Sequence, residues 1–351
     1  MKELNLLKQK LSALFPWNQA RVTFICLFTL ALIDAQTASL YRLAQKFKGK
    51  AKVDSHYKRI QRFFAKFDFD FDLFAQIITK LLPFEDKWLL CVDRTNWKLG
   101  KKNINLLVLG IAYNGFCVPI LWTFLDKRGC SNTNERIELM KRFLGLFGRT
   151  KIAYVTADRE FIGKDWVQFL LDEKISFRIR IRNNTKVLSN RSHQELEIYR
   201  LFTSKRNRVM VLNKKRKIWG LSLHVVGLRT AKEYVIVITD KAPESAMADY
   251  KKRWEIEMLF SCLKGRGFDF EATHLCEGER VNKLMALLAL AFCWCISQGE
   301  FMTRAKDLRV KKHGYKAKGT FRRGLESLTN ILANISMKWL DFRHALTFFV
   351  L

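Results

Sequence analysis

The sequence predicts an α/β protein in which a mixed sheet flanked by helices carries a β-rich insertion and follows a helical N-terminal region. Three observations support this. Residues 1 to about 80 repeat apolar side chains at helical spacing and contain no convincing strand. From residue 88 the pattern changes to consecutive apolar strands, and further along the chain strands and helices alternate, as they do in a mixed sheet.

The N-terminal region contains a basic segment at 48–55 that separates two expected helices. Gly49 can turn the chain, and Asp54 or Ser55 can cap the helix that follows. That helix carries four basic side chains, His56, Lys58, Arg59 and Arg62. A helix-turn-helix DNA reader has this pattern, and so does an ordinary basic helical hairpin, so both interpretations stay open here.

Three apolar runs predict consecutive antiparallel strands, WLLCVD at 88–93, NINLLVLGIAYNG at 103–115 and FCVPILWTFL at 116–125. Asn114-Gly115 predicts a hairpin between the last two. A helix at 134–147, a strand at 151–158, a helix at 161–171 and a strand at 175–184 follow, so the sheet should be antiparallel first and parallel later.

Residues 184–232 are basic, rich in asparagine and contain only short strand-like runs, which predicts an inserted β-rich subdomain. A strand at 233–240 then leads into a helix from Pro243. We therefore expect an N-terminal helical DNA-binding domain at 1–82, a core at 83–183 and 233–300, the insertion at 184–232, and a basic C-terminal helical segment at 301–351.

The net charge of +30, from 63 Lys and Arg against 33 Asp and Glu, indicates a polyanionic partner. The apolar runs at 22–33 and 284–296 are shorter than the roughly 18 to 20 residues of a spanning helix, so they predict buried core helices and no membrane association. The N-terminus lacks the pattern of a signal peptide, which favours a cytoplasmic protein. The eight cysteines and six histidines show no zinc-binding spacing, so free, mostly buried thiols are expected.

The helix expected from Pro243 to about 264 has two faces at 100° per residue. One face is apolar and should pack against the core, and it holds Ile256, Leu259, Phe260 and Leu263. The other face is polar and free for chemistry, and it holds Tyr250, Arg253, Glu257 and Lys264.

This spacing, Tyr250-x2-Arg253-x3-Glu257-x6-Lys264, resembles the YREK signature of bacterial insertion-sequence DDE transposases, in the branch named for insertion sequence four. In that family one aspartate ends the first strand of a ribonuclease-H-like core and another ends the fourth, which correspond here to Asp93 and Asp158. The stretches at 118–136 and 313–328 also look like the family, so the resemblance spans about 85–330.

The resemblance implies a metal-dependent DNA transposase of a transposable element, in which Asp93, Asp158 and Glu257 hold two Mg²⁺ or Mn²⁺ ions. It implies cleavage at the transposon end, a hairpin intermediate in cut-and-paste relatives, strand transfer into target DNA, and a homodimer on double-stranded DNA. Each acid also has a structural interpretation, because Asp93 could open a turn, Asp158 could cap a helix and Glu257 could pair with Arg253. The rival functions are a ribonuclease-H-like nuclease or resolvase without strand transfer, and a non-catalytic DNA-binding protein.

Several further side chains are candidates for DNA contact. In the family the tyrosine, arginine and lysine of the signature contact phosphates, which assigns that role to Tyr250, Arg253 and Lys264. The alternating strand at 178–182 should place its isoleucines in the core and three guanidinium groups on one face, for phosphates or simply for solvent, namely Arg178, Arg180 and Arg182. Trp254 or Trp219 could stack on a flipped base, although most tryptophans belong to a core.

Two acids compete with the proposed ligands. Glu255 should point roughly 160° away from Glu257 on the same helix, where it would be solvated or ion-paired. Asp240 ends the preceding strand and should cap the helix that starts at Pro243, or else serve as an alternative ligand.

Overall fold

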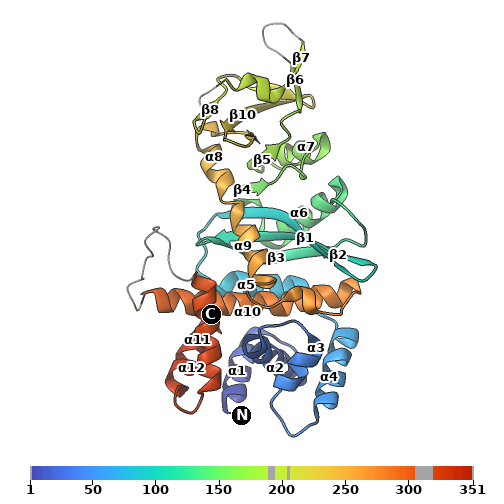
Figure 1. Cartoon of the computed structure of the whole chain (residues 1–351), viewed down its shortest axis with the longest axis vertical. Coiled ribbons are helices and arrows are strands. Elements are labelled where there is room, and N and C mark those ends of the chain that lie inside the picture. The colour runs from blue at the N-terminus through green and yellow to red at the C-terminus, as the bar shows by residue number, and fades with distance from the viewer. Residues whose placement is uncertain (1, 189–193, 204–205, 305–318, 350–351) are drawn as a thin grey trace. The chain divides into compact units, whose positions relative to one another are not determined.

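The computed structural model describes residues 2–188, 194–203, 206–304 and 319–349. The chain divides into two compact units (Figure 1). The helical unit comprises Met1–Pro83, Trp97–Ile104 and Phe260–Leu351, and the sheet unit comprises Phe84–Asn96 and Asn105–Leu259. The helices expected to form a separate N-terminal domain therefore share one unit with the C-terminal helices.

The helical unit is built from eight α-helices in the described part of the chain. The N-terminal five are α1 (Lys2–Leu14), α2 (Gln19–Ala35), α3 (Leu40–Lys46), α4 (Val53–Lys66) and α5 (Phe71–Leu81). The other three are α10 (Gly278–Arg304), α11 (Thr320–Ala333) and α12 (Trp339–Ala345), with 3-10 turns at Phe270–Ala272 and Leu346–Phe349. The predicted absence of strands before residue 80 is confirmed within the described residues.

Helices α3 and α4 form the basic hairpin that the sequence predicts. Gly49 has a φ of 154° in the connection, but neither expected cap is used, because α4 begins after Lys52 and has no side-chain cap. His56 is buried and its ring lies 5.6 Å from that of Phe47, so it is not available to DNA. Lys58 and Arg62 are exposed. Of the four basic side chains that the sequence singles out on α4, two are therefore exposed, while the histidine packs inside the unit.

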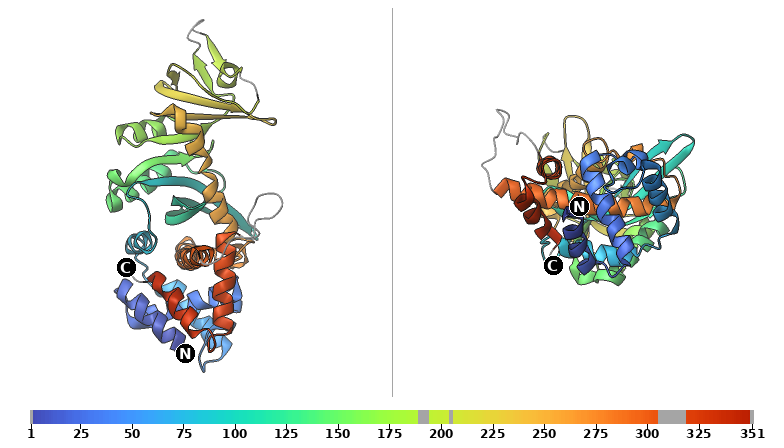
Figure 2. Two further views of the ribbon diagram at one scale, coloured as in Figure 1. Left: turned by 90° about the vertical axis from the view of Figure 1, so that its left-hand side faces the viewer. Right: turned by 90° about the horizontal axis from the view of Figure 1, so that it is seen from below.

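Both long apolar runs are confirmed as buried helices. Helix α10 is long and apolar enough to cross a membrane by length and composition, yet 83% of its apolar window is buried inside the fold. Figure 2 shows α10 (orange) beside the N-terminal helices (blue) and the C-terminal helices (red) of its own unit. Helices α10 and α11 pack so closely that a Cβ on Gly324 would lie 1.7 Å from the carbonyl oxygen of Cys295, and only glycine fits there. Such burial is typical of a core helix.

The sheet unit contains the strands that carry the predicted acids. The first five are β1 (Trp88–Leu99), β2 (Lys102–Tyr113), β3 (Phe116–Phe124), β4 (Ile152–Ala157) and β5 (Phe177–Ile181). The later ones are β6 (Lys186–Leu188), β7 (Glu195–Glu197), β8 (Val209–Val211), β9 (Arg216–Ile218), β10 (Leu221–Arg229) and β11 (Tyr234–Thr239). The strand order is β3-β2-β1-β4-β5-β11-β10-β8, with β9 beside β10.

The sheet contains both parallel and antiparallel strand pairs. Strands β2 and β3 are antiparallel, joined by the predicted Asn114-Gly115 turn with positive φ at both residues, whereas β1, β4 and β5 are parallel neighbours. Strands β11 and β10 then continue the sheet in antiparallel fashion. The insertion is therefore less separate than expected, because β8 and β10 extend the main sheet and only β6 and β7 form a small sheet of their own.

Four helices belong wholly or mainly to this unit: α6 (Thr133–Phe147), α7 (Lys164–Asp172), α8 (Pro243–Lys251) and α9 (Trp254–Leu263). Asn132 and Glu135 form a capping box at the N-terminus of α6. Isoleucine and valine side chains of the central strands are fully buried, for example Val155, Ile179 and Val237. The predicted α/β class is confirmed: a mixed sheet flanked by helices, with a helical N-terminal region.

Candidate active site

The two predicted aspartates lie next to each other at one edge of the sheet. Asp93 follows the buried run 88–92 of β1, and Asp158 follows the last residue of β4. Because β1 and β4 are parallel and Val92 pairs with Ala157, the next residue on each strand is an aspartate. The register thus brings together two carboxylates that are 65 positions apart in the sequence.

Arg253 links Glu257 to Asp93. Its guanidinium donates from Nη1 to Oδ2 of Asp93 at 3.1 Å and from Nη2 to Oε1 of Glu257 at 2.5 Å. The side chain of Arg253 is only 9% exposed, so its ion pair with Asp93 is largely shielded from water, whereas Glu257 is open to solvent at 37%. Tyr250 donates its hydroxyl to Oδ1 of Asp158 at 3.1 Å. All three predicted acids are therefore one hydrogen bond from the tyrosine or the arginine of the same helical segment.

The charges of this site are not evenly balanced. Burial raises the pKa of Asp93 to about 6, against the lowering effects of the Arg94 amide and the Arg253 charge, and Glu160 and Asp158 raise it further. Burial alone would lower the pKa of Arg253, but the charges of Tyr250, Asp93 and Asp158 and the hydrogen bond that Arg253 donates to Glu257 raise it. The arginine is firmly cationic, and the carboxylates beside it need more positive charge than it supplies.

The signature segment is not one helix, as the sequence predicts, but two. Helix α8 ends at Lys251 and α9 starts at Trp254. At the break, tight turns replace the regular pattern, because Arg253 N–H donates to the carbonyl of Tyr250 and Ile256 N–H to that of Arg253. The polar face survives in that Tyr250, Arg253 and Glu257 all point to the aspartates. On the apolar face Ile256, Leu259 and Leu263 are buried as predicted, whereas Phe260 is only half-buried.

Glu255 differs from its prediction. It is neither solvated nor ion-paired at close range; it is half-buried, and its Oε2 is a buried oxygen without a hydrogen-bond partner among the described residues. Burial raises its pKa to about 7, while the backbone amides of Tyr113 and Gly115 and the charge of Lys252 lower it. Glu255 of α9 therefore lies against the β2–β3 turn and apart from Asp93, Asp158 and Glu257.

Asp240 lies at the opposite end of strand β5 from the site. It accepts hydrogen bonds from the Ser176 hydroxyl at 3.1 Å and from the Phe177 amide at 3.2 Å, where β5 begins. Its expected capping role is wrong, since the residue that precedes α8 as its cap is Ala242. Because β11 is antiparallel to β5, the end of β11 meets the start of β5, away from the edge that carries Asp158.

The alternating arginines of β5 do not form one exposed row. Arg178 is 4% exposed, and its guanidinium bonds Asp249 at 3.1 Å and Thr239 at 2.7 Å, so its predicted place on an open face is wrong. Arg180 is mostly covered, pairs with Glu233 at 2.6 Å and lies 4.0 Å from Asp158. Arg182 is exposed. The isoleucines between them are buried as predicted.

Two further predicted DNA contacts have different surroundings. Trp254 is 60% exposed at the start of α9, which is unusual for a tryptophan. Trp219 is half-buried in the turn between β9 and β10. Lys264 belongs to the helical unit, where it pairs with Glu271 at 2.7 Å and lies over the ring of Trp97. Its role towards DNA remains a prediction.

The donor set suits a hard cation, because the three acids offer only carboxylate oxygens. As they lie here, no group of three His, Cys, Asp or Glu side chains within the described residues is already gathered to hold a metal ion. The guanidinium of Arg253 spans Asp93 and Glu257 in the position where positive charge is needed. The residues therefore fit a divalent cation chemically, provided that Arg253 moves aside.

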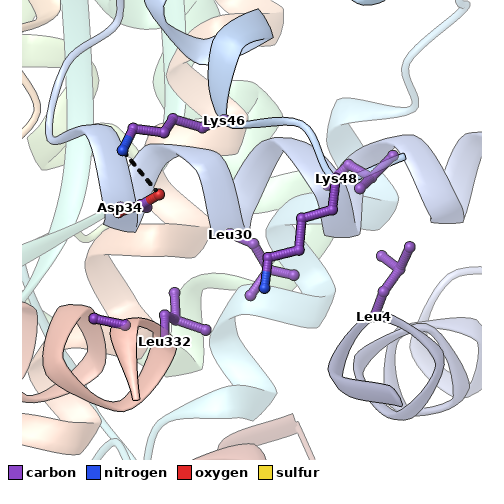
Figure 3. A pocket seen from close by; sticks show the side chains of 8 residues that line it. Leu4, Leu30, Asp34, Lys46, Lys48 and Leu332 are labelled. Carbon is purple, nitrogen blue, oxygen red and sulfur yellow. Dashed lines mark ion pairs between the residues drawn. The ribbon is translucent and has the colours of Figure 1, made fainter. Parts of the chain in front are cut away.

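A pocket in the helical unit has no comparable chemistry (Figure 3). It holds about 70 Å³ and is lined mainly by leucines. Its lysines are already paired, Lys46 with Asp34 at 3.3 Å and Lys48 with Glu3 at 2.8 Å. The eight cysteines are free, as expected, and six of them are buried.

Sequence reasoning missed two charged residues beside the aspartates, Arg94 and Glu160. Arg94 binds both carboxylate oxygens of Glu160 at 3.3 Å. A signal existed, because each aspartate is followed by an arginine, in Asp93-Arg94 and Asp158-Arg159. Only the structure shows which of these arginines crosses to the other strand.

A ribonuclease-H-like sheet with aspartates on neighbouring parallel strands and a glutamate on a following helix defines the class of DDE-type nucleic-acid enzymes. The family model described as "Transposase DDE domain" matches residues 85–294, and the chain belongs to this family of transposases. Its members generally use divalent metals.

Comparison with curated proteins finds no match. Among solved structures, the chain is similar to the piggyBac transposase synaptic complex with hairpin DNA, with a TM-score of 0.48 and 13% identity over 95% of this chain and 77% of that one.

Proposed function

We propose that this protein cuts DNA at the ends of a transposable element and joins the freed end to target DNA, with Asp93, Asp158 and Glu257 as the catalytic carboxylates. The observation that carries the proposal is the register of β1 and β4, which places two aspartates side by side, with Glu257 linked to them through Arg253. Membership of the DDE transposase family supports the assignment.

Two Mg²⁺ or Mn²⁺ ions would be held by these three carboxylates and would supply activation of the attacking oxygen and stabilisation of the leaving oxygen. The protein's own residues prepare the site. Tyr250 orients Asp158, and Arg253 keeps Asp93 and Glu257 close together despite their like charge. The guanidinium of Arg253 has the paired donors that would grip a phosphate if its bonds to Asp93 and Glu257 were released.

The DNA partner is inferred from charge and exposure. A net charge of +30 favours a polyanion, and exposed cations are available on α4 at Lys58 and Arg62 and beyond β5 at Arg182. Trp254 presents an open aromatic face beside the signature, which suits stacking on an unpaired base. Lys264 and Tyr250 complete the phosphate contacts that the YREK resemblance implies.

The finer identity is part of the same proposal. The match of all four signature residues favours the bacterial branch named for insertion sequence four, a homodimer on paired ends, and a cytoplasmic protein acting on DNA. The basic stretch at 304–323, part of that resemblance, lies largely outside the described residues.

The decisive experiment uses the purified full chain, Mg²⁺ and DNA that carries the sequences flanking its own gene. We expect cleavage at the ends of inverted repeats and covalent joining of the 3′-hydroxyl ends to a target plasmid. Cutting without joining would favour a nuclease or resolvase of the same fold. Binding without cutting would favour a non-catalytic DNA-binding protein.

A further inference from the structure

The sequence places an arginine directly after Asp93 and a glutamate two residues after Asp158. In the structure these two side chains meet. Arg94 donates from Nε to Oε1 and from Nη2 to Oε2 of Glu160, each at 3.3 Å, so the pair is bidentate. The side chains are 14% and 24% exposed, and the ion pair is therefore largely protected from solvent screening.

Arg94 acts on Asp93 at the same time. Its backbone N–H donates to Oδ1 of Asp93 at 2.7 Å, a shorter contact than the 3.1 Å hydrogen bond that the same carboxylate accepts from Arg253. One residue therefore orients Asp93 through its main chain and holds the segment after Asp158 through its side chain. We call the Arg94–Glu160 pair the clamp.

The clamp is itself fixed by two neighbouring groups. Asn105 accepts from Nη1 of Arg94 at 3.1 Å and donates to the carbonyl oxygens of Lys127 and Gly129, so it ties the clamp to the loop after β3. Arg136 is 5% exposed and donates to the carbonyl oxygens of Glu160 and Ile162, which holds the loop after β4. Both anchors are buried side chains whose donors and acceptors are used on this one edge of the sheet.

We propose that Arg94 and Glu160 are positioning residues that set the relative placement of Asp93 and Asp158 for metal binding. This inference rests on the proposed function, because it concerns the same carboxylates. Neither residue reaches the signature helix through a contact described above, so the clamp acts only on the two aspartates. The negative charge of Glu160 in the clamp also disfavours the ionised form of Asp93 and so raises its pKa.

The physical reason is that the pairing of β1 with β4 stops at Val92 and Ala157, so the backbone ladder alone does not fix the side chains of the two aspartates that follow. A bidentate ion pair between the residues beside them restricts the separation of the two carboxylates. Groups that orient metal ligands in this way typically change metal affinity or activity about 10- to 100-fold when they are removed.

The test measures Mn²⁺ binding to the full chain by electron paramagnetic resonance, together with the Mg²⁺ concentration that gives half-maximal end cleavage. Glu160→Gln keeps the shape of the side chain and removes its charge, and Arg94→Lys keeps the charge but loses the bidentate geometry. We expect metal affinity to fall about 10- to 100-fold in Glu160→Gln and by less in Arg94→Lys. DNA binding should stay within about two-fold of wild type, because neither residue is assigned to phosphate.

Arg280→Lys is the matched control, because Arg280 forms an ion pair with Glu277 at 2.9 Å in the helical unit. It should leave metal binding unchanged. If Glu160→Gln binds Mn²⁺ as tightly as wild type, the clamp is refuted while the metal site stands. If wild-type protein binds no Mn²⁺ even with end DNA, the proposed function and the clamp fail together. Thermal unfolding of each variant separates a lost fold from lost positioning.

Discussion

Two carboxylates, one in each unit, each meet a cation, yet their pKa values are shifted in opposite directions. In the helical unit, Glu3 accepts a hydrogen bond from Lys48 at 2.8 Å; burial raises its pKa, but Lys48 and local hydrogen bonds outweigh this and lower it to about 2. In the sheet unit, Asp93 is half-buried and also meets a cation, yet its pKa is raised to about 6. At Asp93 burial is the largest cause and the charges of Glu160 and Asp158 add to it, so that the Arg94 amide and the Arg253 charge do not outweigh them.

This comparison separates structural from functional burial of charge. A carboxylate that has one cation to itself stabilises the fold, whereas a group of acids that shares too few cations costs stability. Such destabilising groups of acids are typical of functional sites in proteins. The sheet unit therefore holds the acids of the proposed active site, whereas Glu3 of the helical unit has one lysine as its partner.

The largest expected effect is on cleavage. Asp93→Asn and Asp158→Asn should each reduce metal-dependent end cleavage by at least about a thousand-fold, because each removes a ligand charge worth several kcal/mol in the transition state. Glu3→Gln, the same kind of change in the helical unit, should leave the chemical step intact. A single-turnover cleavage assay with DNA binding measured separately decides this. Equal losses in all three variants would remove the distinction between the units.

The second effect concerns DNA affinity and sharpens the role of the helical unit. Binding should weaken by orders of magnitude, roughly 10³ to 10⁵, between 50 and 200 mM salt if six or more phosphates are neutralised. Lys58→Ala combined with Arg62→Ala should lower the slope of log affinity against log salt by about 2. Fluorescence anisotropy over a salt series measures both. An unchanged slope would exclude α4 from the DNA contacts.

Replacing Arg253, which bridges Asp93 and Glu257, should have a smaller effect on cleavage. Arg253→Gln should weaken cleavage about 10- to 100-fold, as loss of an orienting group does. It should nevertheless leave Mn²⁺ binding intact or tighter in the absence of DNA, because the competing guanidinium is gone. Titration with Mn²⁺ checks this. Complete loss of metal binding would show that Arg253 is needed to assemble the acids.

The smallest effect is on stability, and its sign should differ between the two units. The pKa of Glu3 is lowered from 4.5 to about 2, so its contribution is present above pH 4.5 and is lost as pH falls towards 2. The pKa of Asp93 is raised from 3.8 to about 6, so the folded state loses stability as pH rises from 4 through 6.

At pH 7 without metal, Glu3→Gln should therefore destabilise the protein and Asp93→Asn should stabilise it, each by at most about 3 kcal/mol. Urea unfolding between pH 4 and 8 measures both changes. Below pH 4 the gain from Asp93→Asn should vanish. Two changes of the same sign would break the contrast drawn between the two carboxylates.

Much of the fold and the three acids could be predicted from the sequence, because apolar periodicity marks strands and helices locally and the signature spacing singles out Glu257. The break between α8 and α9 could not be predicted, since residues 250–256 keep a helical pattern while tertiary contacts of Arg253 and Tyr250 decide the backbone. Burial of Arg178 was missed because strand alternation shows the face of a side chain but not what covers it. Asp249, 71 positions away, covers it.

The clamp was missed for a related reason. Arg94 lies within β1 and Glu160 in the turn after β4, and for both of these charged residues solvent exposure is the usual expectation. Only the parallel register of β1 and β4 brings them together. Long-range pairing of charged residues is set by topology, which a single sequence does not display.

The most direct test of the central claim compares Glu257→Gln with Glu255→Gln in metal-dependent end cleavage, with DNA binding and thermal unfolding measured for both. The two residues are two positions apart, but Glu257 meets Arg253 at the aspartates, whereas Glu255 is half-buried near the β2–β3 turn. The account predicts that Glu257→Gln binds DNA and does not cut, and that Glu255→Gln cuts at nearly the wild-type rate. An inactive, folded Glu255→Gln beside an active Glu257→Gln would contradict it.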